Sequence, residues 1–152
     1  MMMRKLLFLL AFAFAAMLQA ADFVTESRWI TASEGDVNAQ NTWIAFRKDI
    51  TLGSIPMKVE ASIAAASKYW LWINGEMVVF EGQLKRGPTP KDTYYDKVDI
   101  TPFLKKGNNE VAVLLWYFGK SGFSHNSSGK SGLLFSAQAI GLYSDSQWMS
   151  CI

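Results

Sequence analysis

Aromatic and charged residues share one polar loop, and their types are those that proteins use to bind sugars. Tyr94 and Tyr95 lie in a Pro- and Gly-rich stretch, Glu81 to Lys97, where large rings are less expected than in a strand. Sugars present C–H faces that stack on Trp and Tyr, while nearby amides and charges bond their hydroxyls. The candidate sugar-binding residues are Lys85, Arg86, Asp92, Tyr94, Tyr95, Trp116 and Tyr117. Alternatively, these rings hold the loop against a core or pack against another domain.

Acidic residues near the same loop suggest glycoside cleavage, which needs one protonated and one ionised carboxyl group beside a bound sugar. Glu76, Glu81, Asp92 and Asp96 lie near a turn and the loop, so they could approach one another. Their simpler interpretation is solvation of the protein surface, which we favour. No catalytic residue is assigned, and whether this chain is an enzyme stays open.

The single histidine and single cysteine are too few for the common metal and nucleophile sites. His125 lies in a Gly- and Ser-rich loop and Cys151 beside the C-terminus, which excludes a zinc site of the usual kind. We expect His125 to be a solvated loop residue rather than a member of a hydrolytic triad. Calcium would find oxygen ligands in Asp92, Asp96 or Asp99, but their spacing indicates no specific site. We predict no cofactor, with calcium as the open alternative.

Short apolar segments separated by Gly, Pro or Asn must position these residues. The segment Met57 to Ser67 alternates, with Val59, Ala61 and Ile63 on one face and Lys58, Glu60 and Ser62 on the other. This period of two is typical of a half-buried strand. Similar segments recur at Thr42 to Leu52 and Glu110 to Phe118, and no long amphipathic helix is evident. The pattern predicts an all-β sandwich.

The stretch YWLWINGEMVVF, Tyr69 to Phe80, predicts a hairpin around Asn74-Gly75, because these residues suit the positive φ of a type I′ turn. A two-residue turn would pair Leu71 with Val78 and Tyr69 with Phe80. The core face would carry Leu71, Ile73, Val78 and Phe80, and the outer face Trp70, Trp72, Met77 and Val79. An apolar outer face of this size indicates that something covers it. We therefore expect the four outer residues to dock a neighbouring segment or domain.

The N-terminal segment, residues 1–20, has the pattern of a secretory signal peptide. Arg4 and Lys5 precede the apolar run LLFLLAFAFAAML, and small residues follow at Ala20 and Ala21. The run is shorter than the roughly 20 residues of a membrane span. Two of the 15 basic residues lie in this segment, which leaves 13 basic residues beside 13 acidic ones. We expect a secreted or periplasmic protein without a membrane span, and no binding of nucleic acid, which needs a cationic surface.

Longer segments carry a resemblance to a known family. The segments YWLWINGEMVVFEG and YYDKVDITPFLKKGNNEVAVLLWYFG resemble the galactose-binding-like jelly-roll domains that precede the catalytic part of several glycoside hydrolases. The loops LKRGPTPKDTYYD and WYFGKSGFSHNSSGKSGLLF are similar to those in the N-terminal region of secreted bacterial α-L-rhamnosidases, glycoside hydrolase family 78. The resemblance covers Trp29 to Trp148 and implies a galactose-binding-like jelly-roll β-sandwich over residues 22–144.

In that family, further β domains and a helical barrel with the catalytic carboxylates follow this domain. Here residues 145–152 resemble only the start of a connector, so we interpret the chain as a fragment that lacks the downstream catalytic domains. The resemblance implies a non-catalytic accessory domain of an enzyme in carbohydrate degradation. The alternatives are a free-standing secreted carbohydrate-binding module and a small complete hydrolase.

Overall fold

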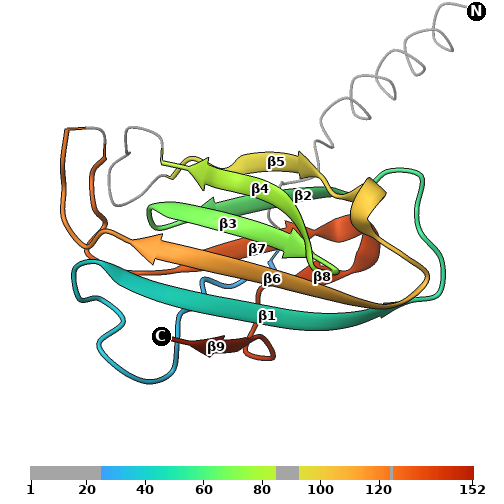
Figure 1. Ribbon diagram of the computed structural model, residues 1–152, viewed down its shortest axis with the longest axis horizontal. Coiled ribbons are helices and arrows are strands. Elements are labelled where there is room, and N and C mark those ends of the chain that lie inside the picture. Colours follow the sequence, from blue (N-terminus) through green and yellow to red (C-terminus); the bar gives the residue numbers. More distant parts are fainter. Residues whose placement is uncertain (1–24, 85–92, 124) are drawn as a thin grey trace, which may run out of the picture.

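Nine strands in two antiparallel sheets make up the computed structural model over the residues it describes, 25–84, 93–123 and 125–152. The first sheet has the order β4-β3-β6-β1-β9, with β1 (Thr42–Leu52), β3 (Lys68–Ile73), β4 (Glu76–Gln83), β6 (Gly107–Tyr117) and β9 (Met149–Cys151). The second has the order β5-β2-β7-β8, with β2 (Glu60–Ala65), β5 (Asp96–Asp99), β7 (Leu133–Ala137) and β8 (Leu142–Tyr143). Short 3₁₀ turns η1 (Thr101–Phe103) and η2 (Gln138–Ile140) follow β5 and β7. The two sheets face each other, which confirms the predicted jelly-roll β-sandwich (Figure 1).

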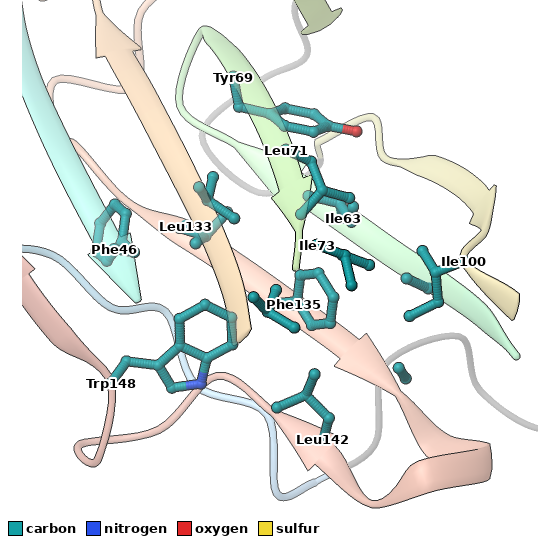
Figure 2. Close-up of a cluster of buried hydrophobic side chains, with 14 of the residues drawn as sticks. Phe46, Ile63, Tyr69, Leu71, Ile73, Ile100, Leu133, Phe135, Leu142 and Trp148 are labelled. Carbon is teal, nitrogen blue, oxygen red and sulfur yellow. The ribbon is translucent and has the colours of Figure 1, made fainter. Parts of the chain in front are cut away.

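Side chains alternate between the core and the outside along the long strands, as their period of two predicts. In β1, Ile44 and Phe46 are buried, while Trp43 and Arg47 face outward. Figure 2 shows how side chains from both sheets, Phe135 among them, converge on one core. Each large side chain that is fully buried contributes about 1.5–3 kcal/mol to folding. This core fixes the strands whose outer faces carry the candidate site.

Strand β2 is more buried than its sequence suggests. The alternation predicts Ser62 on a solvent face, but Ser62 is only 5% exposed, and Ala61 to Ala65 are all buried. The prediction of a half-buried strand was therefore wrong beyond Glu60. Ser62 lies opposite Ser136 on the neighbouring strand, and that residue is buried as well. Because the side chains of Ser62 and Ser136 are short, the surrounding residues cover them easily.

The predicted turn at Asn74-Gly75 joins β3 to β4, and both residues have positive φ, 53° and 81°. The Asn74 side chain ties this turn to the start of β6. Its Nδ2 donates to the carbonyl oxygen of Phe103 at 2.8 Å and to Asn109 Oδ1 at 2.9 Å. Its Oδ1 accepts the backbone N–H of Glu110 at 3.1 Å. The hairpin end is thus held by side-chain bonds as well as by its own strand pairing.

The register of this hairpin differs from the prediction beyond its first pairs. Two irregularities in β4 move the partners, so that Leu71 pairs with Val79 and Tyr69 pairs with Gly82. The predicted partners, Val78 and Phe80, were therefore wrong, although Val78 packs against the core as predicted. Because each extra residue in one strand exchanges its inner and outer faces, Val79 packs against the core and Phe80 turns outward, 71% exposed. Bulges of this kind leave no clear mark in the alternation of the sequence.

Asn109 organises the loop that ends in Gly107, Asn108 and Asn109, within a segment that carries the family resemblance. It is only 3% exposed, and its side chain bonds both the N–H and the carbonyl of Lys105, at 2.8 and 2.7 Å, and the carbonyl of Gly107 at 2.9 Å. Gly107 has a φ of 92°, which a residue with a Cβ adopts only with strain. Asn109 therefore closes the loop before β6 while it also accepts from Asn74.

The segment after Ser144, which the sequence separates as a connector, packs with the sandwich. Trp148 is 6% exposed, its ring centroid lies 5.5 Å from that of Phe135, and its Nε1 donates to the carbonyl of Tyr143 at 2.8 Å. Met149–Cys151 then forms β9, which pairs with β1 at the edge of the five-stranded sheet. Residues 145–151 therefore complete both the core and one sheet.

The predicted signal peptide, residues 1–20, lies outside the described residues. Among the residues that are described, no helix is long and apolar enough to cross a membrane.

Candidate functional site

The outer side of the five-stranded sheet carries neighbouring apolar side chains, which we call the outer aromatic face. Its members are Trp43, Trp70, Trp72, Met77, Phe80, Leu114 and Trp116. The strand registers bring them together, because Trp43 lies opposite Trp116 and Trp70 lies opposite Leu114. Trp43 is 39% exposed and Met77 46%. Neighbouring large apolar side chains that stay this exposed mark an interaction surface.

Stacked rings give this face a fixed geometry. The ring centroids of Trp43 and Trp116 lie 4.9 Å apart with planes 7° from parallel, and those of Trp43 and Trp70 lie 5.5 Å apart at 28°. The Phe80 ring meets Trp70 edge-on at 6.4 Å. Each such pair contributes about 0.5–1.5 kcal/mol beyond the area it buries. Because Trp43 already stacks on two other indoles, it offers little free ring surface to a sugar.

Charged pairs border the outer aromatic face at both ends. Lys68 Nζ lies 2.9 Å from Glu81 Oε2 and 6.0 Å from the ring centroid of Trp116. At the other end, Arg47 Nη2 lies 2.9 Å from Glu110 Oε2. An apolar centre with aromatic residues and a charged rim is the usual composition of a protein–protein interface. The arrangement therefore favours contact with protein.

The residues of the docking face differ in part between the structure and the prediction from the sequence. Trp70, Trp72 and Met77 lie on the outer aromatic face, but Val79 packs against the core and Phe80 takes the outer place instead. Sequence reasoning missed Trp43, Leu114 and Phe80 as members, and it assigned Trp116 to the sugar candidates. The alternation within Thr42 to Leu52 could have placed Trp43 outward, but the neighbours of β1 could not be read from sequence.

The candidate sugar-binding residues do not form one surface. Trp116 and Tyr117 are consecutive in β6, so they point to opposite faces: Trp116 joins the outer aromatic face and Tyr117 is 1% exposed in the interior. Tyr94 is 50% exposed and Tyr95 is half-buried. Lys85, Arg86 and Asp92 lie outside the described residues. Of the predicted set, Tyr94 keeps the exposed ring that sugar contact needs.

Tyr69 and Asp96 form a polar contact between the two sheets. Tyr69 is buried and donates its hydroxyl to Asp96 Oδ2 at 3.0 Å, and the backbone N–H of Gln83 donates to the same oxygen at 2.6 Å. Burial, together with the nearby carboxylate, raises the pKa of Tyr69 well above its usual value. The Tyr69 ring lies over Gly82, where an added Cβ would meet Tyr69 Cζ at 2.3 Å. This contact is structural, since Tyr69 has no exposed surface.

His125 was expected to be solvated, and this expectation was wrong. It is half-buried, its ring meets that of Phe118 edge-on at 5.5 Å, and its Nε2 lies 3.3 Å from Ser67 Oγ. Burial lowers its pKa. Ser67 is only 1% exposed and accepts the backbone N–H of Phe118, so a substrate cannot reach its hydroxyl. The pair has the residue types of a nucleophile and a base but serves to pack the loop.

Glu81, Asp96 and Asp99, which we considered as catalytic or calcium-binding groups, have protein partners. Asp99 Oδ1 accepts both the N–H and the hydroxyl of Thr101, and these bonds lower the pKa of Asp99. Glu81 pairs with Lys68, and Asp96 is held as described above. In the described part of the chain, no group of three or more His, Cys, Asp or Glu is placed to hold a metal ion. Asp92 lies outside that part, so the absence of a cofactor stays a prediction and calcium stays its open alternative.

Comparisons with known proteins add independent information. No protein-family model and no curated protein matches this chain. Among solved structures, the GH78 family rhamnosidase of Bacillus sp. GL1 is 30% identical with a TM-score of 0.70, over 82% of this chain and 13% of that chain. The α-L-rhamnosidase of Aspergillus terreus is 23% identical with a TM-score of 0.63, over 84% of this chain and 17% of that one.

A lectin of Pleurotus ostreatus, solved in complex with GalNAc, is 17% identical with a TM-score of 0.53, over 84% of this chain and 36% of the lectin. At this identity the lectin shares the fold alone. The chain spans only 12% to 17% of the length of the rhamnosidases that it matches. The resemblance found in the sequence is confirmed: the chain is similar, over most of its length, to a β-sandwich that forms a small part of family 78 α-L-rhamnosidases.

Proposed function

We propose that this chain is a non-catalytic accessory β-sandwich domain of an α-L-rhamnosidase-like glycoside hydrolase that acts outside the cytoplasm. The observation that carries the proposal is the match to the Bacillus sp. GL1 rhamnosidase, which is 30% identical and covers 82% of this chain but only 13% of the enzyme. A segment of that size has the length of one domain, and the remaining length of such an enzyme is available for catalysis.

The chemistry of the described carboxylates supports a non-catalytic role. Glycoside hydrolysis needs a carboxyl group with a raised pKa beside an ionised one. Asp99 has a lowered pKa because it accepts two bonds from Thr101, which is the opposite of a general acid. The two bonds from Thr101 stabilise the ionised form of Asp99, so this carboxyl group is a poor proton donor.

The outer aromatic face gives the domain its task in this proposal, which is to pack against the rest of the enzyme. Its three stacked indoles and Phe80 form an apolar centre, and Lys68 with Glu81 lies at its rim. Aromatic residues and Met are enriched where protein interfaces are most buried. Stacking also holds the rings rigid, so docking a partner orders few side chains and costs little conformational entropy.

A hydrolysis assay tests the first part of the proposal. The purified chain should not hydrolyse an aryl α-L-rhamnoside, because it lacks a suitable carboxyl pair among its described residues. Turnover that survives further purification, and that is lost in a variant of one of its carboxylates, would contradict a non-catalytic role.

A chimera tests the accessory role directly. The segment of the Bacillus sp. GL1 rhamnosidase that matches this chain is replaced by residues 25–152, and the hybrid is compared with the same enzyme lacking the segment. We expect the hybrid to be more heat-stable and more active than the deletion. Trp70→Glu should remove this gain, because it places a charge in the apolar centre, whereas Glu60→Gln on the other sheet should keep it. A hybrid that behaves like the deletion would reject the proposal.

The second candidate function is a free-standing carbohydrate-binding module, favoured by the exposed ring of Tyr94. A lectin solved in complex with GalNAc shares the fold, which is therefore compatible with sugar binding. This candidate is tested by titrating the chain with rhamnose-containing oligosaccharides while Trp fluorescence is monitored. The same titration is then repeated with the Tyr94→Ala variant. An unchanged spectrum at millimolar sugar would speak against it.

A further inference from the structure

A row of rings joins the single histidine of the chain to the outer aromatic face. The His125 ring meets Phe118 edge-on at 5.5 Å, and Phe118 meets Trp116 at 4.7 Å with planes 65° apart. Trp116 in turn stacks on Trp43 within the face. We call these four side chains the aromatic row. Because closely packed side chains transmit displacements, movement of His125 removes support from Phe118 and then from Trp116.

Hydrogen bonds around Ser67 fix which nitrogen of His125 carries the proton of the neutral ring. The Ser67 hydroxyl donates its one proton to the carbonyl of Ala66, and its oxygen accepts the backbone N–H of Phe118 at 3.2 Å. Ser67 Oγ must therefore accept from His125 as well, so Nε2, at 3.3 Å, is the donor. A second proton then adds at Nδ1 and gives a half-buried ring a positive charge.

No counter-ion neutralises that charge among the residues that the structure describes. His125 forms no ion pair there, and burial lowers its pKa. The charged residues on the elements that pack against it are Lys68 of β3 and Lys120 and Lys130 of its own loop. Lys68 is paired with Glu81, and the other two lysines are exposed. Since the three nearest charges are positive, the protonated ring is best stabilised in water.

The loop that carries His125 is attached to the sandwich by short polar contacts. Ser127 Oγ lies 3.3 Å from the hydroxyl of Tyr117, which is the titratable group of β6 nearest to this loop in the sequence. The N–H of Ser131 donates to Asn38 at 2.8 Å. Neither contact buries a large apolar surface, unlike the packing of His125 on Phe118. Local opening of an exposed segment of this kind costs less than global unfolding.

We propose that protonation of His125 favours release of its ring from the sandwich, and that the loosened aromatic row then weakens docking of a partner on the outer aromatic face. The docking part rests on the proposed function, whereas the movement of the rings is a property of this chain alone. The driving force is proton linkage: in water the released ring binds a proton more tightly than the packed ring does. His125 is therefore packed at neutral pH and is released more often as the pH falls below 6.5.

NMR of the labelled full chain, from about pH 8 to about pH 4.5, tests the movement of the rings. The Cε1–H of His125 reports its protonation, and the indole N–H signals report the tryptophans. Trp116 Nε1 donates to Asn41 at 2.7 Å, while Trp148 Nε1 donates to Tyr143 at 2.8 Å and serves as the internal control. The Trp116 signal should shift with the same midpoint as His125, and the Trp148 signal should not.

Hydrogen exchange measures the release itself. The amide of Phe118 is protected by its bond to Ser67 Oγ, which also contacts His125. Its protection factor should fall by up to about tenfold per pH unit between pH 6.5 and the lower pKa of the packed His125, because release takes up one proton. A protection factor that stays constant over this range would contradict the release.

Two variants test the assignment to His125. His125→Phe keeps a ring beside Phe118 but cannot titrate, so the transition of Trp116 should disappear. The matched control, Lys130→Gln, removes a charge from the same loop and should keep the transition. The proposal is overturned if Trp116 does not follow His125, if Trp148 follows it equally, or if the transition persists in His125→Phe. The comparison of Trp116 with Trp148 in the wild type decides the outcome even if the variant does not fold.

The chimera described above tests the consequence for docking. Its gain in heat stability over the deletion should be smaller at about pH 5 than at about pH 7, and His125→Phe should remove that difference. An equal gain at both pH values would refute the effect on docking. The two parts fail separately, because a hybrid without any gain rejects the proposed function, whereas the spectra of the isolated chain decide the movement of the rings.

Discussion

Asn109→Ala is the substitution whose effect on stability follows most directly from the structure. The side chain takes part in four hydrogen bonds, with the N–H and carbonyl of Lys105, the carbonyl of Gly107 and the Nδ2 of Asn74. It is only 3% exposed, so water cannot replace these bonds in the folded state. At about 0.5–1.5 kcal/mol for each bond, the free energy of unfolding should fall by about 4 kcal/mol. This is a large share of the roughly 5–15 kcal/mol that stabilises a typical domain.

The assay is urea unfolding followed by Trp fluorescence and circular dichroism, with a thermal melt as a check. A loss of about 4 kcal/mol corresponds to a fall in Tm of roughly 12–20 °C for a chain of this length. The control is Asn38→Ala, because Asn38 is exposed and its side chain accepts the N–H of Ser131. It should cost less than about 1 kcal/mol. If both variants lose the same stability, the claim that Asn109 organises the hairpin end is refuted.

Three further predictions concern packing, proton uptake and the outer aromatic face. Gly82→Ala should destabilise the fold by about 1–3 kcal/mol in urea unfolding, because its Cβ would meet Tyr69 Cζ at 2.3 Å, while Gly53→Ala has open space and should be nearly neutral. Burial lowers the pKa of His125, so the unfolded chain takes up this proton first, and the free energy of unfolding should decrease as the pH falls below 6.5. His125→Gln should flatten that decrease, and an unchanged pH profile would contradict it. Phe80 is 71% exposed on the outer aromatic face. Phe80→Ser should therefore reduce self-association in sedimentation velocity, while the free energy of unfolding changes by less than about 0.5 kcal/mol. Unaltered self-association would argue against the outer aromatic face as an interaction surface.

The sequence predicts the class of fold because alternation, turn residues and the lack of a helical period all agree. It also predicts the turn at Asn74-Gly75, where local φ preferences decide the outcome. It fails at Phe80, because the alternation of the sequence does not reveal the two irregularities in β4 that shift the register there. One extra residue reverses the face assignments beyond it, and the second irregularity restores them at Gly82, which is buried.

The candidate site is harder to predict than the fold. Trp43 and Trp70 stack although 27 residues separate them in the sequence and β6 lies between their strands in the sheet. The strand order that brings them together depends on pairing between strands far apart in the sequence. The period of two marks each strand but does not reveal which strands pair. His125 shows the same limit: its loop composition indicates solvent, but contacts with Phe118 and Ser67 bury half of it.

The stacked indoles of Trp43, Trp70 and Trp116 have an optical consequence. Aromatic chromophores that lie this close and in a fixed orientation share their electronic excitation, and such coupling splits the bands in a circular dichroism spectrum. The separations of 4.9 and 5.5 Å place these rings well inside that regime. A partner that parts the rings would weaken the split band. The spectrum therefore reports, without any label, whether the outer aromatic face is occupied.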